Sequence, residues 1–258
     1  MLDIYKEIVR IRESGQKAAL ASIISRRGST PRKESAKMLI RSDGSIVGSI
    51  GGGCVEAQVW EEAKNVMKEG KSKVLHFDLT SEEIAMDGLV CGGKMDILVE
   101  PILPVPTVFI FGAGHISLPL SKIAKIAGFR VVVIDDRESF ANKERFPEAD
   151  EIIVEGFDSV FSILKINDSS YLVIVTRGHL SDEKVLEQCI KTKAGYVGMI
   201  GSKRKIRTIY SNLKFRGASQ EDLEKVYSPI GIPIKAETPE EIAVSIMAEI
   251  IKVKQDAK

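Results

Sequence analysis

Cysteine is scarce in this sequence, with three among 258 residues, at positions 54, 91 and 189. So small and odd a number excludes a disulfide framework, and we expect reduced thiols in a cytoplasmic protein. An excess of charge is lacking too, because 37 basic and 36 acidic side chains leave a net charge of +1. This balance gives no reason to expect nucleic acid or a membrane surface as a partner.

Long apolar runs are also missing. No stretch approaches the roughly 20 apolar residues that cross a bilayer. Residues 1–7 carry mixed charges instead of the basic and then apolar order of a signal peptide, so we expect no leader and no membrane segment. The remaining composition, 44% hydrophobic and 28% charged, is that of a globular protein able to bury a core.

Three prolines within residues 101–106 separate two parts of different pattern. Proline continues neither a helix nor a central strand, so we expect domains at 1–103 and 104–258. The first part predicts a smaller α+β domain. In the second part strands and helices alternate, which is typical of a Rossmann-like, doubly wound parallel sheet and places the chain in the α/β class.

The spacing of apolar residues and of turn residues predicts the individual elements. In the first domain we expect helices at 2–14 and 55–69 and strands at 18–25, 38–40, 45–50, 74–78 and 94–100. In the second we expect strands at 107–111, 130–135, 151–154, 171–176 and 196–200. Its helices are expected at 115–127, 181–193 and 203–215, with a last one opening on a capping box of Thr238 and Glu241.

A glycine turn opens the second domain. Gly112 permits a tight turn after an apolar strand, and Gly114 lets the backbone approach a phosphate at a helix N-terminus. Asp135 ends the next strand, at the spacing at which an acid reaches a ribose hydroxyl. The motif predicts a nucleotide-like site, and a Rossmann scaffold without a ligand is the alternative.

Two residues near this turn leave its ligand open. Ser117 stands at the third glycine position, where it could hold the helix farther from the strand. Arg137, if free, could meet a 2′-phosphate, so both NAD and NADP remain candidates.

Two histidines follow strands that would be neighbours in such a sheet. His115 comes after the first strand and His179 after the fourth, so both imidazoles would face the crevice between them. Ligand binding or acid–base chemistry is one interpretation, and capping of turns is the other. We expect no metal site, since only Asp136 or Asp182 offers an obvious third ligand.

The first domain contains a run of three glycines, Gly51, Gly52 and Gly53. Such a run leaves backbone N–H groups unobstructed, which suits an anion or a flat polar ligand. Cys54 would then lie at a helix N-terminus, where the dipole favours the thiolate. Glu56 would lie in the first turn, as a dipole-favoured acid or as a functional carboxylate.

Cys91 and Gly92 repeat the combination of thiol and glycine. Two tight turns with incidental cysteines are the alternative interpretation. Cys189 lies between apolar residues of an amphipathic helix and is expected in the core. The basic run at 203–207 is typical of a solvated helix face.

Several of these motifs, in this order, resemble the xanthine dehydrogenase accessory factors of the XdhC/CoxI type over nearly the whole chain. They lie at residues 28–32, 48–56, 91–93, 111–115, 134–137, 140–147, 176–179, 198–202 and 238–243. The resemblance implies a chaperone that binds the molybdenum cofactor (molybdopterin) and protects it during sulfuration. It implies a cysteine desulfurase and a xanthine dehydrogenase-like molybdenum hydroxylase as partners. By position, residues 51–54 and Cys91 become candidates for the cofactor or sulfuration site, and Gly112, Gly114 and Asp135 for the nucleotide-like site.

The resemblance thus favours a maturation factor without catalytic residues of its own. An NAD(P)-dependent oxidoreductase and a nucleotide-sensing assembly protein are the alternative functions. A homodimer is expected from the frequency of symmetric oligomers. Lys235 stands where relatives carry glycine, so no ligand contact is assigned to its loop.

Overall fold

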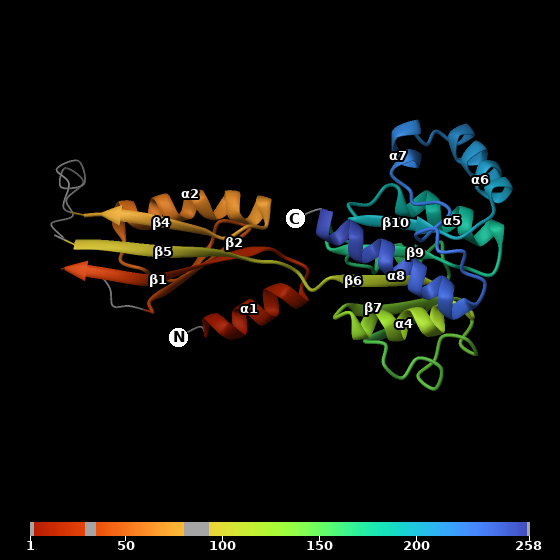
Figure 1. Ribbon diagram of the computed structural model, residues 1–258, viewed down its shortest axis with the longest axis horizontal. Helices are drawn as coiled ribbons and strands as arrows, with labels where there is room; N and C mark the ends of the chain where they lie inside the picture. Colours follow the sequence, from red (N-terminus) through yellow and green to blue (C-terminus); the bar gives the residue numbers. More distant parts are fainter. Residues whose placement is uncertain (1–2, 29–34, 80–92, 257–258) are drawn as a thin grey trace. The chain divides into compact units, whose positions relative to one another are not determined.

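The computed structural model describes residues 3–28, 35–79 and 93–256. The chain divides into two compact units, Met1–Pro104 and Val105–Ala257 (Figure 1). Within the described residues, no helix is long and apolar enough to span a bilayer.

The first unit is built on one antiparallel sheet with strand order β3-β2-β1-β5-β4. Its strands are β1 (Ala18–Gly28), β2 (Lys37–Arg41), β3 (Ile46–Gly48), β4 (Lys73–Asp78) and β5 (Gly93–Ile102). Its helices are α1 (Ile4–Glu13) and α2 (Gly53–Glu69). The long strands β1 and β5 pair from Ala18 and Ile102 to Gly28 and Gly93, which is their whole length.

The two helices cover opposite faces of this sheet (Figure 1). Side chains alternate along a strand, so Ala19 and Ala21 of β1 pack in the cluster that contains α2, whereas Leu20 packs in the cluster that contains α1. Helix α2 buries Val55 and Val59 one turn apart against the first of these faces.

The second unit is built on a parallel sheet with strand order β10-β9-β6-β7-β8. Its strands are β6 (Thr107–Phe111), β7 (Arg130–Asp135), β8 (Glu151–Val154), β9 (Ser170–Ile174) and β10 (Tyr196–Met199). Its helices are α4 (Ser117–Ile126), α5 (His179–Cys189), α6 (Lys203–Phe215), α7 (Gln220–Glu224) and α8 (Pro239–Asp256), with a 3-10 turn at Val160–Ser162. The first strand lies between the second and the fourth, which is the Rossmann order. The predicted α/β fold class is confirmed.

Both faces of the parallel sheet are covered (Figure 1). Ile110 packs in the cluster that contains α4 and α8, and the next residue, Phe111, packs in the cluster that contains α5 and α6. The strands are therefore apolar on both sides, as a buried parallel sheet requires.

The last helix, α8, begins at the predicted capping box. The Glu241 N–H donates to Thr238 Oγ1 at 3.2 Å, and the Thr238 N–H donates to Glu241 Oε2 at 3.3 Å. Just before it, Lys235 has a φ of 57°, the left-handed region that favours glycine. A non-glycine residue is thus held in this conformation shortly before the capping box of α8.

Candidate functional site

The glycine turn between β6 and α4 has the geometry that its sequence predicts. Gly112 has a φ of 105°, and a Cβ there would lie 2.5 Å from the Val175 carbonyl oxygen, so only glycine fits. A Cβ at Gly114, in contrast, would meet no atom within 4 Å. Gly112 thus allows the turn to pack against Val175, directly after β9. Gly114 leaves the backbone of the turn accessible.

A cavity of about 350 Å³ lies at this turn, where the carboxyl ends of β6, β7 and β9 meet. Its lining consists of Gly112, Gly114, His115, Ile116, Asp135, Arg137, Phe140, Val175, Thr176 and Arg177. This is the place at which open parallel sheets of this order bind ligands.

Ser117 does not act as a spacer between helix and strand. Its side chain is buried, and its hydroxyl donates a hydrogen bond to the carbonyl oxygen of Gly112. The serine therefore ties the first turn of α4 to the glycine turn.

Asp135 lines the cavity, but its carboxylate is fully occupied by its own chain. Oδ2 accepts from the Ala113 N–H at 2.8 Å and from Arg137 Nη2 at 3.0 Å. Oδ1 accepts from the Arg137 N–H at 3.1 Å and from Arg137 Nε at 2.8 Å. Four donors satisfy both oxygens. In this conformation Asp135 holds the glycine turn in place and offers no free oxygen to a ribose.

The same contacts shift the pKa of Asp135. Burial would raise the pKa, but the hydrogen bonds from Arg137 and from the Ala113 N–H, together with the Arg137 charge, lower it below the ordinary value. The carboxylate is therefore ionised at neutral pH.

Arg137 is correspondingly not free for a 2′-phosphate. Besides its two-pronged contact with Asp135, its guanidinium stacks on the Phe140 ring at 3.7 Å from the centroid. Arg177, on the neighbouring turn, donates to Asp136 at 2.9 Å. Both arginines at the cavity are paired with carboxylates, and Arg177, whose side chain is half exposed, is the easier of the two to release.

The two histidines do not line the same cavity. Strands β6 and β9 are neighbours, as predicted, and both side chains are exposed. His115 lines the cavity, whereas His179 begins α5 and is not among the lining residues. The structure thus brings only the first of the pair to this cavity.

Asp182 has a structural role that the sequence pattern did not predict. It is fully buried in α5, and its Oδ1 accepts from the Thr176 N–H at 3.1 Å and from Thr176 Oγ1 at 2.7 Å. Its Oδ2 pairs with Lys205 of α6. Asp182 therefore fixes the turn that carries Thr176 into the cavity and is not a free metal ligand. In the part of the chain that the structure describes, no group of three His, Cys, Asp or Glu side chains could hold a metal ion.

In the first unit, the three glycines have positive φ values of 139°, 80° and 65°, at Gly51, Gly52 and Gly53. Glu56 holds this loop from the first turn of α2. Its Oε1 accepts from Ser49 Oγ at 2.7 Å, from the Ile50 N–H at 3.0 Å and from the Gly51 N–H at 3.2 Å. Part of the backbone that was expected to be open to an anion is thus occupied by the protein's own carboxylate.

These hydrogen bonds also govern the protonation of Glu56. Burial would raise its pKa, but donation by the Ser49 hydroxyl and by the backbone N–H groups of residues 50–52 lowers it below the ordinary value. Glu56 is therefore ionised at neutral pH and holds the glycine loop in place.

The cysteines differ in their surroundings. Cys54 is half-buried and is the second residue of α2, at the helix N-terminus, where the sequence placed it. Cys189 is buried in the core, and this burial raises the pKa of its thiol. The predicted site residues Cys91 and Gly92 lie outside the described residues.

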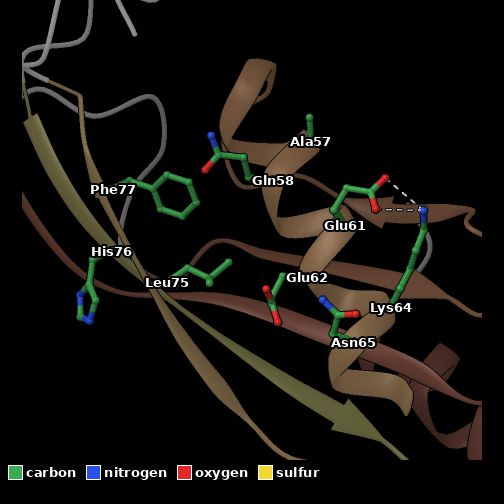
Figure 2. A pocket seen from close by; sticks show the side chains of 9 residues that line it. All are labelled: Ala57, Gln58, Glu61, Glu62, Lys64, Asn65, Leu75, His76 and Phe77. Carbon is green, nitrogen blue, oxygen red and sulfur yellow. Dashed lines mark hydrogen bonds and ion pairs between the residues drawn. The ribbon is translucent and has the colours of Figure 1, made fainter. Parts of the chain in front are cut away.

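A second cavity, of about 560 Å³, lies beside α2 and the edge strand β4 (Figure 2). Its lining consists of Ala57, Gln58, Glu61, Glu62, Lys64, Asn65, Leu75, His76 and Phe77. Its two acids are neutralised, Glu61 by Lys64 at 3.1 Å and Glu62 by Lys73 at 3.0 Å. None of the predicted site residues lines this cavity.

Comparison with known proteins agrees with this architecture. The model of the XdhC Rossmann domain matches residues 108–250, and the model of the XdhC and CoxI family matches residues 11–78. A solved structure from Bacillus halodurans, described as a xanthine dehydrogenase, is 25% identical and has a TM-score of 0.55, with 100% of this chain and 97% of that chain covered.

Three curated proteins are similar along almost the whole chain. The uncharacterized protein YqeB of Escherichia coli K12 is 34% identical over 99% of this chain, which spans 47% of the length of YqeB. A probable xanthine dehydrogenase subunit of Bacillus subtilis 168 is 24% identical, with 94% of this chain and 95% of that protein covered. The molybdenum cofactor insertion chaperone PaoD of E. coli K12 is 26% identical, with 93% and 85% covered. Together with the Rossmann architecture, the family matches show that this chain belongs to the XdhC and CoxI family.

Proposed function

We propose that this protein binds the molybdenum cofactor as cargo and delivers it to a xanthine dehydrogenase-like molybdenum hydroxylase during maturation of that enzyme. The observation that carries the proposal is the similarity to PaoD, a molybdenum cofactor insertion chaperone, over 93% of this chain. The relative from B. subtilis, a probable xanthine dehydrogenase subunit, supports the same setting.

The Rossmann cavity suits the phosphate of such a cargo. Within the described residues, the backbone N–H groups of Gly114, His115 and Ile116 have no hydrogen-bond partner, and α4 has no side-chain cap. A phosphate at this helix N-terminus would gain those donors and a favourable dipole. Because Gly114 has no side chain, nothing there blocks its approach.

The glycine loop of the first unit is a second, separate candidate for the place where the cargo binds. Cys54 would supply a soft ligand beside the backbone of residues 51–53, with Glu56 keeping the loop in shape. The bound cofactor would supply the molybdenum and its sulfur ligands, which this chain would shield from water. We further propose that a cysteine desulfurase delivers sulfur here and that the protein works as a homodimer.

The alternative function, an NAD(P)-dependent oxidoreductase, lacks a ribose contact in the described conformation. The oxygens of Asp135 are all engaged, and Arg137 is held by that same carboxylate. We therefore rank nucleotide-dependent catalysis below cofactor handling.

The test is the cofactor content of protein produced in cells that make the molybdenum cofactor, by molybdenum analysis and pterin fluorescence. Three variants accompany the wild type: Gly114→Ala, Cys54→Ala and, as a matched control, Gly156→Ala, whose Cβ would also find space. We expect near-stoichiometric cofactor in wild type and control, and a loss of about tenfold in affinity, or about 1.4 kcal/mol, when a site residue is replaced.

The pattern of loss assigns the site. A loss confined to Gly114→Ala places the cargo at the Rossmann cavity, and a loss confined to Cys54→Ala places it at the glycine loop. Wild-type protein without molybdenum or pterin, and unable to take them up, would overturn the proposal.

A further inference from the structure

Helix α6 carries charge of one sign. Its 13 residues contain five cations and no carboxylate. The cations are Lys203, Arg204, Lys205, Arg207 and Lys214. Three of them form the first turn of the helix, where the positive end of the dipole disfavours them. Lys205 pairs with the buried Asp182, but Lys203 and Arg204 have no such partner among the described residues, so the fold gives no reason for their charge.

The helix divides cleanly into a buried side and an exposed side. Ile206, Ile209 and Leu213 are buried in the core of the unit. At helical spacing on the opposite side lie Arg204, Arg207, Ser211 and Phe215, all exposed. The Phe215 side chain is 94% exposed, the most of the large apolar side chains described.

The cations of this side are available, and the helix that carries them is held firmly. Lys203, Arg204 and Arg207 form no ion pair with any described residue. Both ends of α6 are anchored to α5, by Lys205 on buried Asp182 and by Arg216 on Glu183 and Glu187. A rigid element with two unpaired arginines and an exposed aromatic ring carries residue types that are enriched at protein interfaces.

We propose that the exposed side of α6, formed by Lys203, Arg204, Arg207, Lys214 and Phe215, docks on a protein partner. The partner's surface carries carboxylates and an apolar socket for Phe215. Arg204 and Phe215 are 11 residues apart, so the acidic cluster and the socket are separated by about 17 Å. The identity of the partner as the hydroxylase that receives the cofactor rests on the proposed function; the docking chemistry does not.

Charge complementarity favours a protein over a lipid surface. A helix that binds a bilayer inserts a continuous apolar face. Here the apolar face is committed to the core, and Phe215 is the single large apolar side chain on the exposed side. One aromatic ring on the same side as the unpaired Lys203, Arg204 and Arg207 suits an acidic protein surface with one pocket.

The experiment places a photo-cross-linking amino acid at Ser211, in the middle of this surface, in the full chain expressed in its own cells. We expect one main adduct, whose cross-linked peptides, identified by mass spectrometry, are rich in Asp and Glu. The double variant Arg204→Glu, Arg207→Glu should lower the adduct yield at least about tenfold, the effect of losing roughly 1.4 kcal/mol. The control Lys122→Glu, Lys252→Glu makes the same change of net charge on α4 and α8 and should leave the yield unchanged.

Adduct formation that is absent, or equally strong in the Arg204→Glu, Arg207→Glu variant, would overturn the proposal. So would binding to vesicles of anionic phospholipid that this variant abolishes, since it would assign the surface to lipid. An adduct with a protein other than a molybdenum hydroxylase would count against the proposed partner, and cross-linked peptides without Asp and Glu would overturn the docking chemistry as well. Cofactor content, measured in the same variants, reports on the proposed function separately.

Discussion

Two carboxylates, Glu56 and Asp135, brace backbone loops of their own chain. Each accepts N–H donors from a glycine-rich turn that precedes it in the sequence. Glycine makes such turns possible but gives them many unfolded conformations, and a fixed acceptor selects one of these. At both candidate sites, the acid therefore determines the shape of the loop that would meet a ligand.

The brace at Glu56 predicts a graded loss of stability. Glu56→Ala removes the acceptor of three donors and should cost about 1–3 kcal/mol, whereas Glu56→Gln keeps an acceptor and should cost less. Urea unfolding followed by the fluorescence of Trp60, the single tryptophan, reports on this unit. Glu61→Ala, which breaks an exposed ion pair with Lys64, should change stability by less than about 0.5 kcal/mol. Equal effects of the three substitutions would contradict the assignment.

The lowered pKa of Glu56 predicts acid sensitivity of the first unit. A carboxyl whose pKa is lower in the folded state adds stability that is fully present above its ordinary value of 4.5. That contribution is lost as the pH falls through the folded-state pKa. The urea midpoint reported by Trp60 should therefore decrease from pH 6 to pH 3, and less steeply in Glu56→Gln. A variant with the same slope as wild type would show that another group is responsible.

Gly112 and Gly114, two residues apart, should respond differently to the same substitution. Gly112→Ala forces a Cβ to 2.5 Å from the Val175 carbonyl oxygen at a φ of 105°, and should destabilise the second unit by more than about 2 kcal/mol. Gly114→Ala meets open space and should leave stability within about 0.5 kcal/mol of wild type. Thermal unfolding by circular dichroism distinguishes the two, and similar melting temperatures would contradict the geometry.

Among the helices and strands, those with a strong apolar period and clear end signals were predicted well. The five parallel strands begin within one residue of their predicted positions and end within two. The short helix α7 was not predicted, because five residues are too few to show a period. The left-handed backbone at Lys235 was not predicted from the sequence, and only the structure shows it.

The capping box of α8 predicts a local contribution to stability. Thr238→Ala removes the acceptor for the Glu241 N–H and should cost about 1 kcal/mol, measured by thermal unfolding. Ser211→Ala, on the exposed side of α6, serves as the control and should be nearly neutral. Equal melting temperatures for Thr238→Ala and Ser211→Ala would show that the capping box does not stabilise α8.

For the whole molecule, we propose that residues 1–103 and 104–258 are separate folding domains, each with its own core clusters. Residues 104–258 produced alone should then unfold cooperatively. Their melting temperature should be close to that of the second unit within the full chain. In the full chain, Gly112→Ala should shift the transition of the second unit and leave the Trp60 transition in place. A single transition that shifts as a whole would show that the units are coupled.

The sequence by itself determined the Rossmann class, most elements and the glycine turn, because these depend on local chemistry, and its motifs carried the resemblance to the family. Apolar period, capping residues and the freedom of glycine act over a few neighbouring positions. Only the tertiary structure decided what the polar side chains contact. Asp135 reaches Ala113 across 22 residues, and Asp182 reaches Lys205 across 23. Such pairs form only when parallel strands bring their carboxyl ends together, and that proximity is a property of the folded sheet.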